Sequence, residues 1–417
     1  MEKKKILVLA DHPLAPSGVG TQTRYMIEAL LATDRYKFIC FGGAVKHQNN
    51  NPQKVEGYGD DWIIYPVEGY GTQEMVRSVM WTERPDVLWF MTDPRFYDWL
   101  WDMENEIRPN MPMVYYHVWD NYPLPVYNKP SYESTDVIAC ISKLTHEIVK
   151  KTAPDVESCY LPHAVDTGIF RPLERSEIAE FKKQQFGEDD ARFTFFWNNR
   201  NARRKMSGSL LWWFNEFAEE VGPENVRLIM HTDPKDPHGQ DLEAMIYSLG
   251  AADGRIMLSK QKVPPEVLAM MYNACDVTLN ISDAEGFGLS TLESLSCATP
   301  IVVNLTGGLQ EQVTNGEDWF GIGLNPASKA VIGSQMVPYI YEDRVSKEDF
   351  IAALKTLYNM PREELEQLGR HGHGHVLKNY NFDQFCSRWV DLIDKVVEQH
   401  GSWEERKGYK SWSLREI

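Results

Sequence analysis

The segment VTLNISDAEGFGLSTLESLSCATPIVVN, residues 277–304, decides the fold class. It begins with the apolar run 277–281, which predicts a buried strand, and it ends with a second such run at 301–304. A glycine-containing loop and a helical pattern at 290–297 lie between them. A strand, a helix and a second strand in this order form a unit whose two strands are parallel. The segment therefore predicts a parallel sheet covered by helices.

The same alternation continues along most of the chain. Short apolar runs predict further strands at 6–10, 38–41, 63–66, 87–91, 114–117, 137–141, 159–161, 192–197, 226–231 and 255–258. Helical patterns lie at 25–31, 74–81, 96–107, 210–221, 242–249 and 267–274. Three more follow at 350–358, 363–376 and 382–400. This rhythm predicts an α/β protein built from doubly wound sheets.

A polar, charged segment at about 174–192 divides the alternation into two runs. A chain of 417 residues is long for one domain, so we predict two Rossmann-like domains, at 1–170 and 171–394. In such domains ligands bind beyond the carboxyl ends of the strands. We therefore expect a ligand cleft where the two sheets face each other.

Composition excludes several classes of protein. Hydrophobic residues make up 43% of the chain, which excludes global disorder, and a net charge of −17 argues against binding to nucleic acid. The six cysteines form no C-x-x-C pair and are expected to be buried thiols in a reducing compartment. The apolar run at 6–10 is too short for a signal peptide, and no run has the length of a membrane span. We expect a cytoplasmic protein; peripheral membrane contact and the oligomeric state stay open.

The loop between residues 281 and 290 has the features of a phosphate site. Backbone amides from Gly288, Leu289 and Ser290 open a helix, and the positive end of a helix dipole favours an anion. Glu285 precedes the glycines, where it can meet a sugar hydroxyl or simply be solvated. Glu293 lies in the first helical turn, where Ser290-x-x-Glu293 also fits a capping box.

A cluster of cations follows the predicted strand at 192–197, in the sequence WNNRNARRKMSG of residues 197–208. Arg200 could hold a diphosphate through two hydrogen bonds, and Lys205 could supply a compact positive charge. An exposed basic turn is the alternative. Because the cluster lies between a strand and a helix, the phosphate interpretation is favoured.

Together these motifs resemble the retaining glycosyltransferases of family 4, which have the GT-B fold. The resemblance rests on the E-x7-E spacing of Glu285 and Glu293 and on the R-x4-K spacing of Arg200 and Lys205. Further landmarks occur in order at residues 17–20, 161–166, 170–172, 299–303 and 306–308, so it covers nearly the whole chain. It implies that a hexosyl group passes from a nucleotide-diphosphate sugar to an acceptor hydroxyl. It also implies that a C-terminal helix at about 395–417 crosses back to an N-terminal acceptor domain.

The resemblance also implies roles for single residues. Glu285 would contact the donor sugar and Glu293 the nucleotide ribose, while Arg200 and Lys205 would bind the diphosphate. The remaining expected donor contacts are Gly18, Gly20, Phe287, Gly288, Leu289 and Ser290. His117 would lie near the reacting centre, so the expected catalytic set is Glu285, His117, Lys205 and Arg200. Trp119, close to His117 in sequence, is the candidate surface for stacking an acceptor.

No cofactor is implied beyond the donor itself. The chain has no Asp-x-Asp pair to hold a metal, so the cations and the helix N-terminus would stabilise the departing diphosphate. The histidines of RHGHGH, residues 370–375, fall in a helical pattern, where a spacing of two points them apart. We expect them to be solvated or to cap helices, and His163 to be structural.

Four departures from the family pattern stand out. Asn199 replaces the usual glycine before Arg200, and Met206 and Ser207 stand where a glycine commonly follows the lysine. The stretch 231–239 is longer and more polar than a plain glycine turn, and residues 325–345 look inserted. These departures weaken any inference about which base or sugar is recognised.

Three other interpretations remain. A sugar-nucleotide hydrolase or epimerase would use the same two-domain fold, and a non-catalytic protein could bind a glycan or a nucleotide sugar. A dinucleotide oxidoreductase is disfavoured because no clear G-x-G-x-x-G follows the first strand: after Gly18-Val-Gly20 the chain has Arg24 where a third small residue is expected, near position 23.

Overall fold

The structure is a computed structural model that describes residues 2–47, 51–187 and 191–410. Contacts between residues group the chain into two compact units. The first comprises Met1–His163, Gly333–Tyr339 and Asp383–Ile417, and the second comprises Ala164–Ile332 and Ile340–Phe382. The two units are described separately below.

The first unit contains an eight-stranded sheet in the order β3-β4-β2-β1-β5-β6-β7-β8. All neighbours are parallel except β3 and β4. The strands are β1 (Lys4–Asp11), β2 (Tyr36–Gly43), β3 (Gln53–Lys54), β4 (Trp62–Pro66), β5 (Val87–Met91), β6 (Met113–His117), β7 (Val137–Cys140) and β8 (Glu157–Tyr160). The helices among them are α1 (Gly18–Leu31), α2 (Gln73–Glu83), α3 (Asp98–Trp101), α4 (Glu104–Ile107), α5 (Lys129–Glu133) and α6 (Lys143–Thr152). Because β1 lies between β2 and β5, the strand order reverses at its carboxyl end, where such folds bind ligands.

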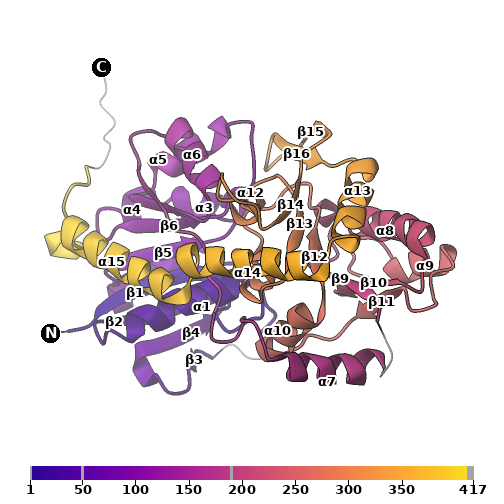
Figure 1. The fold of residues 1–417 in the computed structure, drawn as a ribbon. Coiled ribbons are helices and arrows are strands. Elements are labelled where there is room, and N and C mark those ends of the chain that lie inside the picture. Colours follow the sequence, from indigo (N-terminus) through magenta and orange to yellow (C-terminus); the bar gives the residue numbers. More distant parts are fainter. Residues whose placement is uncertain (1, 48–50, 188–190, 411–417) are drawn as a thin grey trace. The chain divides into compact units, whose positions relative to one another are not determined.

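The long helix α15 (Phe382–His400) packs against the first unit. Its Trp389 is fully buried and meets the rings of Trp89 on β5 and Tyr116 on β6 edge to face. The predicted return of a C-terminal helix to the N-terminal sheet is thus confirmed (Figure 1). The helix runs from Phe382 to His400, so the predicted bounds of 395–417 are wrong: residues 401–410 contain only a 3-10 turn, Trp403–Glu405, and residues 411–417 lie outside the described residues.

The second unit contains a six-stranded, fully parallel sheet in the order β11-β10-β9-β12-β13-β14. Its strands are β9 (Phe193–Asn198), β10 (Val226–His231), β11 (Ile256–Ser259), β12 (Val277–Asn280), β13 (Ile301–Asn304) and β14 (Gly321–Leu324). Its helices are α7 (Arg175–Phe186), α8 (Ser207–Val221), α9 (Leu242–Ser248), α10 (Pro265–Ala274), α11 (Leu289–Ser296), α12 (Leu309–Val313), α13 (Lys347–Tyr358) and α14 (Arg362–Asn379). The strand order reverses between β9 and β12. The predicted α/β class with two Rossmann-like sheets is confirmed.

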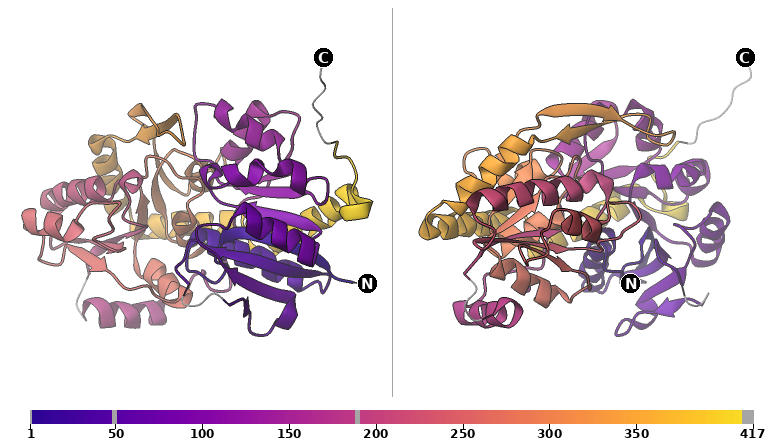
Figure 2. Two further views of the ribbon diagram at one scale, coloured as in Figure 1. Left: turned by 180° about the vertical axis from the view of Figure 1, so that it is seen from behind. Right: turned by 90° about the vertical axis from the view of Figure 1, so that its right-hand side faces the viewer.

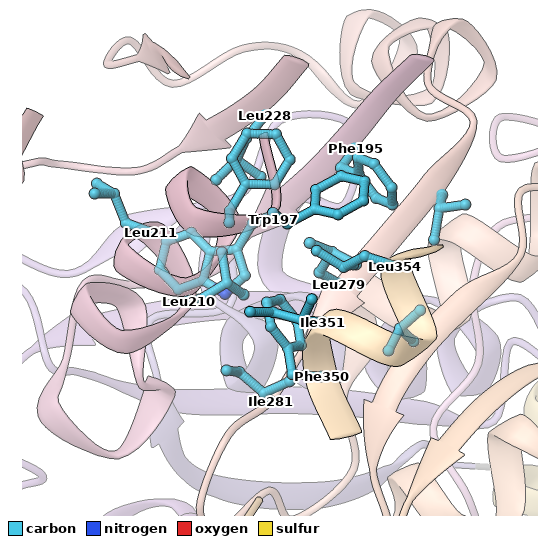
Figure 3. Packing of buried hydrophobic residues seen from close by; sticks show 14 of the residues in the cluster. Phe195, Trp197, Leu210, Leu211, Leu228, Leu279, Ile281, Phe350, Ile351 and Leu354 are labelled. Carbon is cyan, nitrogen blue, oxygen red and sulfur yellow. The ribbon is translucent and has the colours of Figure 1, made fainter. Parts of the chain in front are cut away.

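The core of the second unit lies between its sheet and the helices α8 and α13. Phe195 and Trp197 of β9 are fully buried against Leu210 of α8, and Phe350 and Leu354 of α13 close the cluster (Figure 3). Burying an apolar side chain of this size stabilises a fold by about 2 kcal/mol. The core therefore holds β9 firmly, and the loop that follows β9 starts from a fixed point.

One predicted helix is wrong. Residues 96–107 form a short 3-10 turn, Pro94–Phe96, followed by α3 and α4, because Tyr97 and Met103 leave helical backbone angles. The buried Tyr97 hydroxyl donates hydrogen bonds to the carbonyls of Leu9 and Met91, 2.6 and 3.2 Å away. These contacts with two strands outweigh the local helical pattern.

The segment predicted to be inserted forms a hairpin of β15 (Ser328–Ile332) and β16 (Ile340–Arg344). Its two antiparallel strands form a separate sheet, and the right-hand view of Figure 2 shows them as an orange ribbon apart from the parallel strands. Neither strand is predicted by the sequence, and β3 and β14 are also missed. No helix in the described part of the chain is long and apolar enough to cross a membrane.

Candidate functional site

Two loops meet at the reversal point of the sheet in the second unit. The first follows β9 and ends in a 3-10 turn, Arg203–Lys205, and the second joins β12 to α11. Lys205 Nζ forms an ion pair with the carboxylate of Glu285, and each residue is only 8% exposed. The two predicted residues are therefore neighbours, although 80 positions separate them.

The charges around Glu285 keep it ionised. Burial alone would raise the pKa of Glu285, but the cations Lys205 and Arg204 outweigh this effect and hold the pKa below its ordinary value. Arg204 lies 4.0 Å from the same carboxylate and donates a 2.6 Å hydrogen bond to the carbonyl of Ala284. The site thus combines two cations with one carboxylate.

Backbone hydrogen bonds join the loops. The Asp283 amide donates to the carbonyl of Arg204 at 2.8 Å, and the Gly308 amide donates to the carbonyl of Glu285 at 3.1 Å. A Cβ on Gly308 would lie 2.6 Å from Phe287 Cα, closer than real Cβ contacts allow, so only glycine fits there. The predicted TGG landmark therefore supports the loop that carries Glu285.

The helix α11 begins beside this ion pair. Gly288 precedes it with φ +94°, and a Cβ there would also meet Leu309 at 2.5 Å. The amides of Leu289 and Ser290 open the helix, where backbone donors lack partners within the helix. Phe287 is buried, and its carbonyl accepts a 2.8 Å hydrogen bond from the side chain of Gln312.

The capping-box interpretation of Glu293 is wrong. Gly288, not Ser290, is the N-cap residue, so Ser290 already lies within the helix. Instead the Tyr272 hydroxyl donates to Glu293 Oε2 at 2.8 Å, and Asn198 at the end of β9 donates to Tyr272. Burial raises the pKa of Glu293 to about 7, against the lowering effect of Tyr272.

Arg200 is not brought to the ion pair. Its guanidinium makes two hydrogen bonds, 2.6 and 3.2 Å, with the carboxylate of Asp236, and its side chain is 62% exposed. Asp236 belongs to the polar stretch 231–239 that is longer than a plain turn. The neighbours that sequence reasoning missed are Arg203, Arg204, Asp283 and Tyr272. The R-x4-K motif specifies only Arg200 and Lys205, so it gave no signal for the two arginines between them.

In the first unit, a glycine loop follows β1. Asp11 accepts hydrogen bonds from the Ser17 hydroxyl at 2.7 Å and from the Tyr70 hydroxyl at 2.9 Å. Ser17 in turn caps α1 by accepting from the Gly20 amide. A Cβ on Gly20 would lie 2.7 Å from the carbonyl oxygen of His12, so the turn requires glycine. Gly18 is the first residue of α1.

His117 ends β6 and is fully buried. Its Nε2 shares a 2.7 Å hydrogen bond with the Tyr132 hydroxyl, while Nδ1 has no hydrogen-bond partner among the described residues. Burial lowers the pKa of His117 to about 3, so the ring is neutral at physiological pH. Trp119 is also buried, stacked 6.2 Å from His117, and its indole donates to the carbonyl of Asn121.

His163, His373 and His375 have structural partners. Burial lowers the pKa of His163 to about 3, and its Nδ1 hydrogen-bonds with the Tyr116 hydroxyl. On α14, His373 and His375 hydrogen-bond with the carbonyls of Ser296 and Glu311, near the carboxyl ends of α11 and α12. They cap those helices. Within the described ranges, no three His, Cys, Asp or Glu side chains are grouped so that they could hold a metal ion.

Comparison with known sequences agrees with this geometry. Residues 180–372 match the family model described as "Glycosyl transferases group 1", which spans both loops of the second unit. A D-inositol 3-phosphate glycosyltransferase of Acidothermus cellulolyticus is 39% identical over 99 residues, 23% of this chain and 22% of the relative. The N-acetyl-alpha-D-glucosaminyl L-malate synthase of Bacillus anthracis is 23% identical over 238 residues, 56% of this chain and 57% of the relative. The alignments thus span between about a fifth and somewhat over half of the length of these relatives.

Solved structures match the whole architecture. A sucrose-phosphate synthase from Thermosynechococcus elongatus superposes with a TM-score of 0.75, covering 95% of this chain and all of that one, at 16% identity. The Anabaena protein HepE, solved with UDP and glucose, gives a TM-score of 0.68 over 94% of this chain and all of that one, at 14% identity. The fold is GT-B.

Proposed function

We propose that this protein is a retaining, metal-independent glycosyltransferase that moves a hexosyl group from a nucleotide-diphosphate sugar to an acceptor hydroxyl. The observation that carries the proposal is the buried ion pair of Lys205 and Glu285 beside the first amides of α11. The "Glycosyl transferases group 1" match over residues 180–372 supports the same activity.

The donor diphosphate would bind to Lys205, Arg204 and the amides of Leu289 and Ser290. When the glycosidic bond breaks, negative charge builds on the leaving phosphate, and donors already in position stabilise it by about 3 kcal/mol each. Arg200 can contribute only after it leaves Asp236, so its share should be smaller. The same cations would stabilise the negative charge that a bound metal ion stabilises in metal-dependent enzymes.

The rest of the donor would meet the two glutamates. Glu285 would accept a hydrogen bond from a sugar hydroxyl, since Lys205 keeps it charged. Glu293 would accept from the ribose hydroxyls, beside the hydroxyl of Tyr272. In the first unit, the loop with Gly18 and Gly20 would contribute donor contacts, and neutral His117 would contribute a hydrogen bond to the reactants. The acceptor would bind in the first unit, a glycan or a small molecule.

The test is a screen of UDP-, GDP- and ADP-sugars with candidate acceptors, with chelator present. UDP-glucose is the first probe because HepE, a structural relative, was solved with UDP and glucose. Transfer to an acceptor, with the anomeric configuration of the donor retained in the product by NMR, supports the proposal. Loss of activity in EDTA that a divalent ion restores would contradict the metal-independent part.

A hydrolase or epimerase on the same fold is the second candidate. It would consume the donor in the absence of any acceptor, so the same screen separates it. A non-catalytic binder would retain the nucleotide without consuming it. The paired Lys205 and Glu285 favour a catalyst, because a binder has no need of a buried carboxylate at the phosphate site.

A further inference from the structure

The β15–β16 hairpin stands outside the parallel sheet and yet reaches the loops of the donor site. Its first strand is largely exposed, whereas Glu342 and Asp343 near the end of β16 are 1% and 3% exposed. Burying two adjacent carboxylates is costly unless both are well partnered. The partners of these two residues therefore indicate what the end of the hairpin does.

Glu342 holds the cation loop. Its carboxylate accepts two hydrogen bonds from the guanidinium of Arg203, one of them at 3.0 Å, and a third from Arg344 at 3.1 Å. Burial alone would raise the pKa of Glu342, but the two arginines lower it overall, so the carboxylate stays charged. A bidentate pair of this kind fixes the orientation of the arginine as well as its position.

Asp343 holds the other loop. Its amide donates to the carbonyl of Asp283 at 2.8 Å, and its carbonyl accepts from Asn304 at 2.6 Å. Its carboxylate accepts a 2.8 Å hydrogen bond from the hydroxyl of Thr306. Asn304 also donates to the carbonyl of Ser282. Asp343 thus ties the start of the Glu285 loop to the end of β13.

The geometry of the cation loop transmits the contact at Arg203 to Lys205. Arg203–Lys205 form a single 3-10 turn, in which successive side chains project about 120° apart. Arg203 points to Glu342, Arg204 to the carbonyl of Ala284, and Lys205 to Glu285. Fixing one of the three directions fixes the rotation of the turn, and therefore the other two.

We propose that the β15–β16 hairpin positions both loops of the donor site, with Glu342 as the positioning residue that sets Lys205 through Arg203. The role in catalysis rests on the proposed function; the role in ordering the loops does not. Glu342 itself would touch neither the donor nor the acceptor. The hairpin thereby supplies a support that the E-x7-E and R-x4-K motifs do not contain.

The test compares Glu342→Gln, Arg203→Gln and the double variant with wild-type protein. Glu342→Gln keeps the shape of the side chain and removes its charge. We expect the KM for the donor to rise at least about tenfold, the KM for the acceptor to stay within about twofold, and the double variant to be no worse than the worse single one. Glu348→Gln, an exposed carboxylate at the start of α13, is the matched control and should behave as wild type.

Hydrogen–deuterium exchange of the ligand-free protein gives a second readout that needs no activity. The amide of Asp283, bonded to Arg204, should exchange at least about tenfold faster in Glu342→Gln, while amides of the β9 core stay protected. A donor KM within about twofold of wild type, together with unchanged exchange, would overturn the proposal. Equal changes in both KM values with a lower melting temperature would also overturn it, because they indicate a purely structural role. If wild-type protein transfers no sugar, the proposed function fails and the exchange measurement still decides the positioning.

Discussion

The two units place different side chains at the carboxyl ends of their strands. In the second unit the loops carry charged pairs: buried Lys205 with Glu285, and the more exposed Arg203 with the buried Glu342 of β16. In the first unit, His117 at the end of β6 is buried and neutral. The charged loops suit a ligand that carries and gains negative charge. A neutral imidazole suits an uncharged group such as a hydroxyl.

The comparison also concerns pH. Histidine is the side chain expected to titrate near neutrality, but burial lowers the pKa of His117 to about 3. Burial raises the pKa of Glu293 and of Asp283 to about 7 instead, with Glu342 and Asp343 adding to the effect at Asp283. We therefore expect Glu293 and Asp283 of the second unit, and not His117 of the first, to govern how the properties of the site change with pH near neutrality.

The largest expected effect tests the charged loops of the second unit. Lys205→Ala removes the cation nearest to Glu285, and kcat/KM for the donor should fall by about a thousandfold, as when a preorganised donor to a developing anion is lost. Steady-state kinetics measure the change, and circular dichroism checks the fold. Lys235→Ala, a half-exposed lysine of the same unit, is the control. Unchanged kinetics in Lys205→Ala would refute its phosphate role.

Glu285→Gln separates the sugar from the nucleotide. Because Glu285 would meet the sugar, transfer should fall about a hundredfold while the affinity for the free nucleoside diphosphate changes by no more than a few-fold. Calorimetry with the free nucleoside diphosphate gives its affinity, and kinetics with the sugar nucleotide give the rate of transfer. An equal loss in both would assign Glu285 to nucleotide binding, and Glu317→Gln on an exposed turn controls for charge.

Asp283→Asn tests the raised carboxyl pKa. The Asp283 carboxyl is buried, Oδ1 accepts no hydrogen bond among the described residues, and its pKa of about 7 exceeds the ordinary value of 3.8. The folded protein then binds more protons than the unfolded chain between pH 4 and 7, so this group makes stability fall as pH rises through that window. The slope is at most about 1.4 kcal/mol per pH unit per group. Glu293 contributes in the same direction.

Urea unfolding at several pH values between 4 and 8 measures that slope. The wild-type protein should lose stability toward pH 7 from these two groups, and Asp283→Asn should lose less. Burial is the main cause of the raised pKa of Asp283; Glu342 and Asp343 raise this pKa further, and Arg344 and Arg203 lower it. An identical slope in the variant would show that Asp283 is ionised throughout.

Arg200→Ala should have a smaller effect. Its exposed pair with Asp236 contributes little to stability, and donor kcat/KM should fall by less than about tenfold. The measurement is the same kinetic assay used for Lys205. A loss as large as that of Lys205→Ala would mean that Arg200 leaves Asp236 to bind the diphosphate.

The smallest expected effect, on the pH profile, concerns His117 of the first unit. His117→Gln keeps a side chain that can hydrogen-bond and removes the ring. Since His117 is already neutral, the pH profile of transfer between pH 6 and 8 should keep its shape, whatever happens to the rate. A shift of the profile would show that His117 titrates in this range.

The sequence predicted what periodicity and local motifs encode. Nearly every strand of the two parallel sheets was predicted within a residue or two, because buried parallel strands are continuous apolar runs. Lys205 and Glu285 were each predicted to contact the donor from a loop that follows a strand, and the structure has them paired. The strand, glycine loop and helical pattern of residues 277–297 located α11 to within one residue.

The rest depended on contacts that spacing does not encode. The pairing of Arg203 with Glu342 joins residues 139 positions apart, and one of them lies in a hairpin that no family motif covers. Arg200 was expected at the phosphates, yet the carboxylate of Asp236 in a neighbouring turn holds it. The predicted helix 96–107 does not form because the Tyr97 hydroxyl hydrogen-bonds with backbone carbonyls of two strands. Each case is a tertiary contact that outweighs a local pattern.

A crystal structure with a nucleoside diphosphate bound tests the central claim most directly. The account predicts the two phosphates within hydrogen-bond distance of Lys205 Nζ and of the amides of Leu289 and Ser290, with Arg203 still held by Glu342. Phosphates bound elsewhere, with the Lys205–Glu285 pair facing no ligand, would contradict it.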